Sequence, residues 1–407
     1  MTVSDSRAAT AGPDAVPPVP LNPPSWRERF LAWRDRTVAN PRFQRWAAAF
    51  PLTRPVARRR AHDLFDLVAG FVYSQVLLAC VRLNVFEILA VAGPLTAPAL
   101  AQRLSLPEDA ALRLLAAAVS LRLLERRGAG PDGERYGLGA LGAPLVGNAA
   151  ILSMIEHHAA LYADLRDPVG LMRGETGSTA LGGYWPYVHY ETPEGGQGAP
   201  ARLSAERVAE YSALMSASQP LVAEQVFDAY PLSRHRCLLD VGGGEGTFLI
   251  AAAPHAPALK LVLFDLPAVA ERARARFAEL GLAARATAVG GSFFDDELPT
   301  GADIVSLVRV MFDHPDERAL QILRAVHRAL PPGGTLLLAE PMSATPGAEA
   351  MGDAYFGFYL LAMGRGRARS AADLTALLHA AGFERVRRLP TRMPLQTGLL
   401  VARRALR

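Results

Sequence analysis

Lysine is almost absent from this sequence, because Lys260 is the only one and arginine supplies the rest of the 43 basic residues. Cysteine is nearly as rare. Cys80 and Cys237 each lie in an apolar run, and neither belongs to a CxxC pair or a Cys/His cluster, which excludes a disulfide framework and a cysteine-ligated zinc site. We interpret both as buried free thiols in a reducing cytosol, and we expect no metal ion.

Long hydrophobic runs are also lacking. The longest one, residues 67–81, has about 15 residues and contains Gln75, whereas a membrane span needs about 20 apolar residues. Residues 1–25 lack the apolar core of a signal peptide, and their composition predicts a disordered tail. The sequence therefore predicts a cytoplasmic protein without a transmembrane helix.

The length exceeds the size at which a single core usually keeps growing, and half of the residues are hydrophobic, so we expect two domains. Shifts in composition divide the chain into a tail, a basic aromatic arm, a helical domain, a segment of linker helices with a lid, and an α/β domain. These five segments are residues 1–25, 26–61, 62–148, 149–230 and 231–407.

Residues 26–60 combine arginine with tryptophan and phenylalanine at helical spacing. One interpretation is a helix lying on a membrane, because aromatic rings prefer the headgroup boundary and arginine attracts anionic lipid. The other is a helix that packs on its own domain or on a partner subunit. Nucleic-acid binding is disfavoured, because the basic residues form one short arm without a recognition motif.

The helical domain ends in a pattern of two short helices, residues 94–106 and 107–127, followed by a small strand within 132–142. This order is the winged-helix arrangement, so a DNA-binding regulator is one hypothesis. The second helix would offer a DNA groove mostly Ala and Leu, with only Arg113 and Arg122 before its basic end. Such a surface suits a dimer interface better.

After a predicted helix at 151–172, the glycine- and aromatic-rich residues 174–200 predict a long loop over a pocket. Glu156, His157 and His158 form a polar cluster in this helix. Adjacent helix positions do not share a face, so we do not propose them as a metal site.

The clearest motif is a buried strand, CLLDV, followed by glycines and then a helix. Glycine lets the backbone turn tightly and approach a ligand. A dinucleotide fingerprint counted from Gly242 requires glycine where Thr247 stands, which disfavours nicotinamide and flavin cofactors. The next strand ends in Asp265, placed to accept both ribose hydroxyls of a nucleoside cofactor. With three further strand-like runs in order, this predicts a doubly wound α/β sheet.

The motifs LLDVGGGEGTF, VLFDLPAV, GGSFFDDELP and LPPGGTLLLAEP together resemble the S-adenosylmethionine-dependent O-methyltransferases of the hydroxyindole and plant small-molecule type. The resemblance covers about residues 62–404. It implies a class I methyltransferase Rossmann-like sheet, and it makes 62–148 a winged-helix dimerisation domain of a homodimer. It also implies cofactor-binding residues: Asp240, Gly242, Gly244, Asp265, Leu266, Ser292, Phe293 and Arg309.

Two positions depart from the family. Ser292 stands where the family has an Asp that contacts adenine, so we expect weakened cofactor binding. Plant relatives carry a segment like LHDWPDE whose His removes a phenolic proton, and here MFDHPDE puts Phe312 at that position. A phenol with a pKa of about 10 loses its proton readily to a nearby His. An aliphatic alcohol is far less acidic, so alignment of oxygen and methyl would provide most of the rate, and the proton would leave late.

His314 is the best single candidate for the proton acceptor, and the alternative is a His that caps the next helix or faces solvent. Asp313 would orient it or cap that helix. Glu340, which the family also has, would hold the base or the hydroxyl.

The motif VRVMFDHPDE (308–317) and the basic aromatic arm at 26–60 are most similar to the carotenoid-pathway branch of the family. This branch comprises the hydroxyneurosporene or demethylspheroidene O-methyltransferases of purple photosynthetic bacteria. This implies methylation of the tertiary C-1 hydroxyl of an acyclic carotenoid on the way to spheroidene or spirilloxanthin, with peripheral contact to the inner or photosynthetic membrane. Apolar stripes are more typical of core, but in this branch several residues would line the substrate pocket: His157, Met311, Phe312, Tyr355, Phe356, Tyr359 and Met363.

Other functions stay open. One is an O- or C-methyltransferase of a phenol or a tetrapyrrole. Another is a dimeric winged-helix regulator that senses the cofactor.

Overall fold

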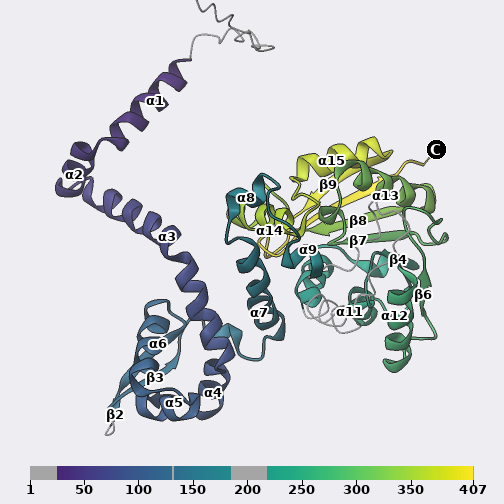
Figure 1. Cartoon of the computed structure of the whole chain (residues 1–407). Coiled ribbons are helices and arrows are strands. Elements are labelled where there is room, and N and C mark those ends of the chain that lie inside the picture. Colours follow the sequence, from purple (N-terminus) through teal and green to yellow (C-terminus); the bar gives the residue numbers. More distant parts are fainter. Residues whose placement is uncertain (1–24, 131–132, 185–217, 407) are drawn as a thin grey trace, which may run out of the picture. The chain divides into compact units, whose positions relative to one another are not determined.

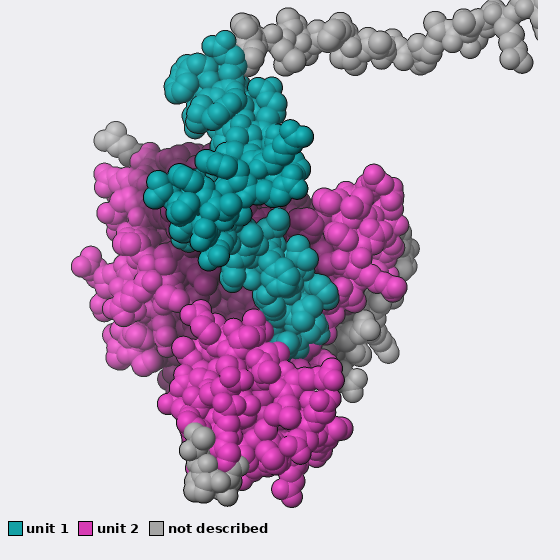
Figure 2. Space-filling model, turned by 90° about the vertical axis from the view of Figure 1, so that its left-hand side faces the viewer, with its two compact units in different colours: residues 1–76 teal, residues 77–407 magenta. Residues whose placement is uncertain are grey.

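The computed structural model describes residues 25–130, 133–184 and 218–406 (Figure 1). The chain divides into two compact units, residues 1–76 and 77–407, which Figure 2 colours teal and magenta. Outside the described residues lie residues 1–24 of the tail predicted at 1–25, residues 185–200 of the predicted loop, and residues 201–217 of the segment of linker helices.

The first unit is a succession of helices with few buried side chains. Ser25 and Glu28 form a capping box that starts the first helix, in which no residue is buried. Asn40 ends this helix and caps the next one by accepting from the backbone N–H of Arg42 at 2.9 Å. The helices are α1 (Trp26–Ala39), α2 (Pro41–Ala49) and α3 (Arg54–Arg82), the last of which continues into the second unit.

Helix α3 is longer than the apolar run that the sequence suggested. By length and composition it is the one helix among the described residues that could cross a membrane. Only 11% of its 18-residue apolar window is buried, whereas a core helix would be mostly buried. Leu64, Leu67 and Phe71 are among its exposed side chains. The boundary expected between residues 61 and 62 falls inside this continuous helix.

The second unit begins with a small winged-helix domain, which confirms the predicted arrangement. The helix expected over 107–127 ends at Ser120, however, because Arg122 adopts a left-handed backbone (φ 57°) and the following residues pair with β3. The strands form an antiparallel sheet in the order β1-β3-β2. The elements are α4 (Val85–Ala92), β1 (Leu95–Thr96), α5 (Ala97–Leu104), α6 (Glu108–Ser120), β2 (Leu124–Gly130), β3 (Gly133–Leu138) and η1 (Ala143–Leu145).

Linker helices follow. Asn148 caps α7 through the backbone N–H of Ile151 at 3.2 Å. Asp164, at the end of α7, accepts from the backbone N–H groups of Ala180 and Leu181 at 2.6 and 2.8 Å, which fixes the start of α9. The helices are α7 (Ala149–Asp164), α8 (Pro168–Met172), α9 (Ala180–Tyr184), a helix described over 218–229, and η3 (Leu232–Arg234).

The α/β domain contains a seven-stranded sheet in the order β6-β5-β4-β7-β8-β10-β9, parallel except for β10, which runs antiparallel to both of its neighbours, β8 and β9. The doubly wound sheet predicted from the sequence is confirmed. The strand order reverses between β4 and β7, and ligands of such sheets bind at the carboxyl ends beside this point. The strands are β4 (Cys237–Val241), β5 (Lys260–Asp265), β6 (Ala286–Gly290), β7 (Ile304–Val308), β8 (Thr335–Glu340), β9 (Phe383–Leu389) and β10 (Gly398–Arg404).

Alternating side chains of the buried strands serve two cores. Leu239 of β4 belongs to the core formed with α13 and α15, and Leu238 to the core formed with α11 and α12. Figure 1 shows these helix pairs on opposite sides of the strands. The remaining elements are α11 (Thr247–His255), α12 (Pro267–Glu279), η4 (Met311–Asp313), α13 (Asp316–Ala329), the π-helix η5 (Ala350–Tyr355), α14 (Phe356–Met363) and α15 (Ala371–Ala380).

Candidate functional site

The glycine loop after β4 is shaped by close packing on one side and open space on the other. A Cβ on Gly242 would lie 2.9 Å from Cγ2 of Val310, and one on Gly243 would lie 2.4 Å from Oδ2 of Asp240. Gly242 and Gly244 also have positive φ angles of 69° and 59°, which favour glycine. A Cβ on Gly244 would meet nothing within 4 Å, so this part of the loop is free to receive a ligand.

Asp265 is held over the loop by two backbone hydrogen bonds. Its Oδ2 accepts from the N–H of Gly244 at 2.8 Å and its Oδ1 from the N–H of Leu266 at 2.7 Å. Burial raises the pKa of this carboxyl to about 6, and the two backbone donors oppose the rise. The carboxylate is thus fixed at the end of β5, and each oxygen keeps a lone pair for ribose hydroxyls.

Asp240 is a second buried acid beside the loop. The hydroxyl of Ser306 donates to its Oδ1 at 2.6 Å, and burial raises the pKa of the carboxyl to about 7. Its Oδ2 is buried and has no hydrogen-bond partner among the described residues. This unpaired oxygen of Asp240 lies next to Asp265 and the open glycine loop. It could accept a hydrogen bond from the polar amino-acid end of a nucleoside cofactor.

Ser292 begins a tight turn after β6. Its backbone N–H donates to Asp296 at 2.8 Å, and its hydroxyl donates to Oδ2 of Asp295 at 2.9 Å. The position where the family has Asp therefore carries a hydroxyl bound to a neighbouring carboxylate. No local sequence signal singles out Asp295, because its contact with Ser292 depends on the turn.

The predicted catalytic segment lies between β7 and α13. Phe312 is only 4% exposed, and its backbone N–H donates to Oε2 of Glu340 at 3.2 Å. Burial raises the pKa of Glu340 to about 8, with the charge of Arg369 acting in the opposite direction and that of Asp313 adding to the rise. Glu340 therefore holds the backbone of the Met311–Asp313 segment through its hydrogen bond from the N–H of Phe312.

His314 is 6% exposed and lies edge-on against Phe293 and Phe294, with ring centroids 5.6 and 5.5 Å away. Helix α13 has Pro315 as its N-cap and no side-chain cap. The alternative in which His314 faces solvent is therefore wrong, and the N-cap residue of α13 is Pro315 rather than His314 or Asp313. The catalytic role of His314 stays a prediction.

Arg369, which the sequence analysis missed, organises this segment. It is fully buried and donates to the carbonyl oxygens of Met311 at 2.7 Å and His314 at 2.6 Å, and its Nε donates to Asp316 at 2.8 Å. Sequence offers no signal for it, because a buried arginine is recognised only by the acceptors around it.

The structure brings most of the predicted pocket residues together where α7 meets η5 and α14. Nε2 of His157 lies 2.8 Å from the hydroxyl of Tyr359, and Phe356 packs against Tyr355 and Phe312. Tyr359 is buried in a cluster with Phe312. Met311 and Met363, also predicted for the pocket, have almost no exposed surface and lie in the core.

His158 was noted in the sequence but not chosen as a site residue. Its Nε2 lies 2.7 Å from the hydroxyl of Tyr355, while Glu156 turns to an ion pair with Arg82 at 3.0 Å. The two tyrosine partners, Tyr355 at the end of η5 and Tyr359 in α14, stand about one helical turn apart. Among the described residues, no group of three or more His, Cys, Asp or Glu could hold a metal ion.

Arg309 links the cofactor edge to this aromatic group. It follows β7 with a left-handed backbone (φ 60°), and its Nη1 donates to the hydroxyl of Ser218 at 2.7 Å. Its charge favours the ionised form of Tyr355, although burial dominates and raises the pKa of that phenol to about 12. Positive φ in a non-glycine residue is uncommon and is found at functional sites.

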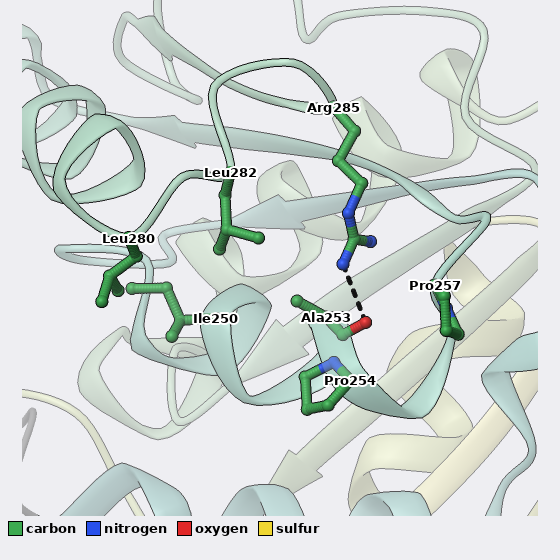
Figure 3. Close-up of a pocket in the computed structure, with 7 residues that line it drawn as sticks. All are labelled: Ile250, Ala253, Pro254, Pro257, Leu280, Leu282 and Arg285. Carbon is green, nitrogen blue, oxygen red and sulfur yellow. Dashed lines mark hydrogen bonds between the residues drawn. The ribbon is translucent and has the colours of Figure 1, made fainter.

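A hollow of about 460 Å³ lies elsewhere, beside the end of α11 (Figure 3). Its single charged side chain, Arg285, is already engaged, because it donates to the carbonyl oxygens of Ala253 and Leu259 at 2.8 and 3.1 Å. None of the predicted site residues lines this hollow. It does not belong to the site described above.

Comparison with known proteins gives matches over most of the chain. Residues 65–148 match the O-methyltransferase dimerisation domain and residues 190–384 the O-methyltransferase domain. The chain is 43% identical over 367 residues to a demethylspheroidene O-methyltransferase of Cereibacter sphaeroides, covering 90% of this chain and 93% of that protein. It is 40% identical over 356 residues to the protein of the same name from Rhodobacter capsulatus, covering 87% and 85%.

Among solved structures, the fold is similar to that of human N-acetylserotonin methyltransferase in complex with S-adenosylmethionine. The TM-score is 0.69, and the alignment covers 85% of this chain and 98% of that chain at 24% identity. This likeness concerns the fold.

Proposed function

The chain belongs to the family of S-adenosylmethionine-dependent O-methyltransferases with an N-terminal dimerisation domain, and we propose that it methylates the tertiary C-1 hydroxyl of an acyclic hydroxycarotenoid, demethylspheroidene or hydroxyneurosporene. The observation that carries this proposal is the 43% identity to a demethylspheroidene O-methyltransferase over nearly the full length of both proteins. The family resemblance that the sequence motifs indicated is confirmed.

When bound, S-adenosylmethionine supplies an electrophilic methyl group on a sulfonium sulfur. We assign its ribose to Asp265, whose carboxylate is fixed by Gly244 and Leu266, and its amino-acid end to Gly242 and the buried oxygen of Asp240. Phe293 and Ser292 would meet the adenine, and Arg309 would close the side toward the substrate. These roles rest on the position of each residue at the carboxyl ends of the strands.

The replacement of the family's His by Phe312 supports an alcohol as the substrate. The side chain of Phe312 is buried and its N–H is bound by Glu340, so nothing at this position can accept a proton. A phenol would gain much from a base here, since its pKa is about 10. A tertiary alcohol would instead depend on the alignment of its oxygen with the methyl group.

The apolar wall of the site suits a long hydrocarbon chain. Tyr355 and Tyr359 face α7, and Phe356 packs against both tyrosines. We propose that these three residues contact the carotenoid near its hydroxyl end, with the loop predicted at 174–200 acting as the lid of the linker segment 149–230. Met311 and Met363 would support this wall from the core. One candidate for the proton acceptor is His314, which Asp313 would orient and Glu340 would support.

The dimerisation domain makes the protein a homodimer. We propose in addition that the arm contacts a membrane peripherally, because Trp26, Phe30 and Trp33 form an exposed stripe along α1 with arginines on both sides. A carotenoid dissolved in lipid would be collected there. Co-sedimentation with vesicles that contain anionic lipid tests this contact, and equal recovery of a variant lacking residues 1–49 would assign the arm to protein contacts instead.

The test of the reaction is transfer of labelled methyl from S-adenosylmethionine to 1-hydroxyneurosporene in lipid vesicles, with a catechol and an indole phenol as parallel acceptors. Label in the carotenoid alone is expected. Label in a phenol, or in none of the three, would overturn the assigned substrate and leave the family assignment intact.

A further inference from the structure

Two histidine–tyrosine pairs lie side by side between α7 and the η5–α14 helix. One joins His157 to Tyr359, and the other joins Nε2 of His158 to the hydroxyl of Tyr355 at 2.7 Å. The two pairs differ in surroundings. Tyr359 is buried in an apolar cluster, whereas Tyr355 packs against the same cluster and is only half-buried. The Tyr355 pair is therefore the one whose hydroxyl is available to a substrate.

Tyr355 lies at an irregular point of the helical backbone. It is the last residue of the π-helix η5 and the residue from which α14 starts. Single π-turns are rare and occur frequently at functional sites. The ring of Tyr355 also lies edge-on against His158, with centroids 5.5 Å apart, so the phenol and the imidazole fix one another.

The site needs a proton acceptor that the family motif no longer supplies. Phe312 replaces the usual His, and the ring of His314 is enclosed by Phe293 and Phe294. The ring of Tyr355 lies 5.0 Å from that of Phe356, which in turn packs against Phe312. The charge of Arg309, which follows β7 at the cofactor edge, also acts on the Tyr355 phenol. A neutral phenol can accept one proton only if it gives up its own, and His158 is in place to take it.

We propose that Tyr355 and His158 form a proton relay that accepts the hydroxyl proton of the substrate during methyl transfer. This inference rests on the proposed function. In the Nδ1–H tautomer, Nε2 of His158 accepts from Tyr355, and the phenol oxygen keeps a lone pair for the substrate hydroxyl.

The substrate oxygen forms its bond to the methyl carbon as the S–C bond breaks, with that electron pair remaining on sulfur. The O–H proton passes to the oxygen of Tyr355, whose own proton passes to Nε2 of His158. The products are a neutral ether, a neutral thioether and an imidazolium, which later returns its proton to water.

The electrostatics of the pair agree with a relay rather than a standing phenolate. Burial raises the pKa of Tyr355 to about 12, so the phenol is protonated at rest. Burial also lowers the pKa of His158, so the imidazole is neutral and its lone pair is available. Charge appears on the pair only as the alcohol loses its proton, late in the reaction.

The decisive variants are Tyr355→Phe and His158→Phe, each of which keeps a ring and removes one member of the relay. We expect kcat to fall about 10²-fold in each, with KM and calorimetric cofactor affinity within about threefold of wild type. The double variant should be no slower than either single variant, because residues that act as a unit are not additive. The solvent isotope effect on kcat should change in both single variants.

Tyr230→Phe is the matched control. Tyr230 also bonds a histidine through its hydroxyl, His235 at 2.9 Å, but at the amino end of β4, away from the cofactor loop. Turnover of this variant should equal that of wild type. Wild-type enzyme that methylates no hydroxycarotenoid would overturn the proposed function itself. Methylation by wild type with Tyr355→Phe within a few-fold of it, or additive losses in the double variant, would overturn the relay alone.

Discussion

The guanidinium of Arg369 donates through Nη2 to the carbonyl oxygen of His314 at 2.6 Å. A second hydrogen bond of the same side chain reaches the carbonyl oxygen of Met311 at 2.7 Å. One buried cation thus fixes both ends of the short segment that carries Phe312 and Asp313. The geometry of the segment from Met311 to His314 therefore depends on Arg369, a fully buried residue.

Replacing Arg369 by Met should lower the free energy of unfolding by about 3 kcal/mol or more, because Asp316 and two carbonyl oxygens lose their buried donor. Urea unfolding with an unchanged m-value measures the effect. Arg367→Met is the control. The Arg367 side chain is half exposed and pairs with Asp316 at 3.3 Å, so its removal should cost less than about 1 kcal/mol. Equal losses in the two variants would contradict the role assigned to Arg369.

Glu340→Gln should change how stability depends on pH. Burial raises the folded-state pKa of Glu340 from 4.5 to about 8, so between these values the folded protein holds a proton that the unfolded chain has released. Stability of the wild type therefore falls through this window as pH rises, by up to about 1.4 kcal/mol per pH unit from this group. Gln removes that slope and can still accept from the N–H of Phe312.

Urea unfolding of both proteins at pH 5, 6, 7 and 8 checks the Glu340 prediction. The free energy of unfolding of the variant should rise relative to that of the wild type at each successive pH. Parallel stability curves would show that Glu340 is ionised throughout the range.

Asp265→Asn should raise the dissociation constant of S-adenosylmethionine about 10- to 100-fold, because the amide has one acceptor oxygen in place of two. Wild-type affinity should also fall below about pH 6, where the carboxyl, whose pKa burial raises to about 6, takes up a proton. Calorimetry gives both results. Glu271→Gln, on the exposed outer side of α12, should bind the cofactor as wild type does. Unchanged affinity in Asp265→Asn would remove Asp265 from the cofactor site.

His314→Phe separates the two candidates for the proton acceptor. The phenyl ring can keep the edge-on contacts to Phe293 and Phe294, so we expect turnover within a few-fold of wild type and unchanged cofactor affinity. A loss of about 10²-fold with intact cofactor binding would make His314 the base and would contradict the relay through Tyr355. Steady-state kinetics with the hydroxycarotenoid decides between them.

The parts of this protein that sequence predicts well are those governed by local patterns. Glycines after CLLDV, an acid at the end of β5 and buried strand runs are short-range signals, and the sheet and its cofactor edge follow from them. The prediction of a helix over 107–127 was wrong at its C-terminal end. The alanine- and leucine-rich pattern continues past Ser120, but the left-handed backbone of Arg122 and the pairing of the following residues with β3 end the helix there.

Contacts between distant residues were beyond the sequence. His158 and Tyr355 are 197 positions apart, and Arg369 lies 55 positions from His314. Nothing local distinguishes a histidine that meets a phenol from one that meets solvent. The cap expected at α13 shows the same limit, because a polar residue before Pro315 fits a cap equally well until its burial is known.

The π-helix at Ala350–Tyr355 makes the active site sensitive to chain length as well as to side-chain chemistry. A π-turn holds one residue more than an α-turn does, so the angular position of the residues before α14 depends on how many of them there are. Deleting a single residue there would turn the preceding segment by about 100° relative to α14, with every side chain chemically intact. A one-residue deletion would then disturb the position of Tyr355 relative to the preceding backbone without removing its hydroxyl.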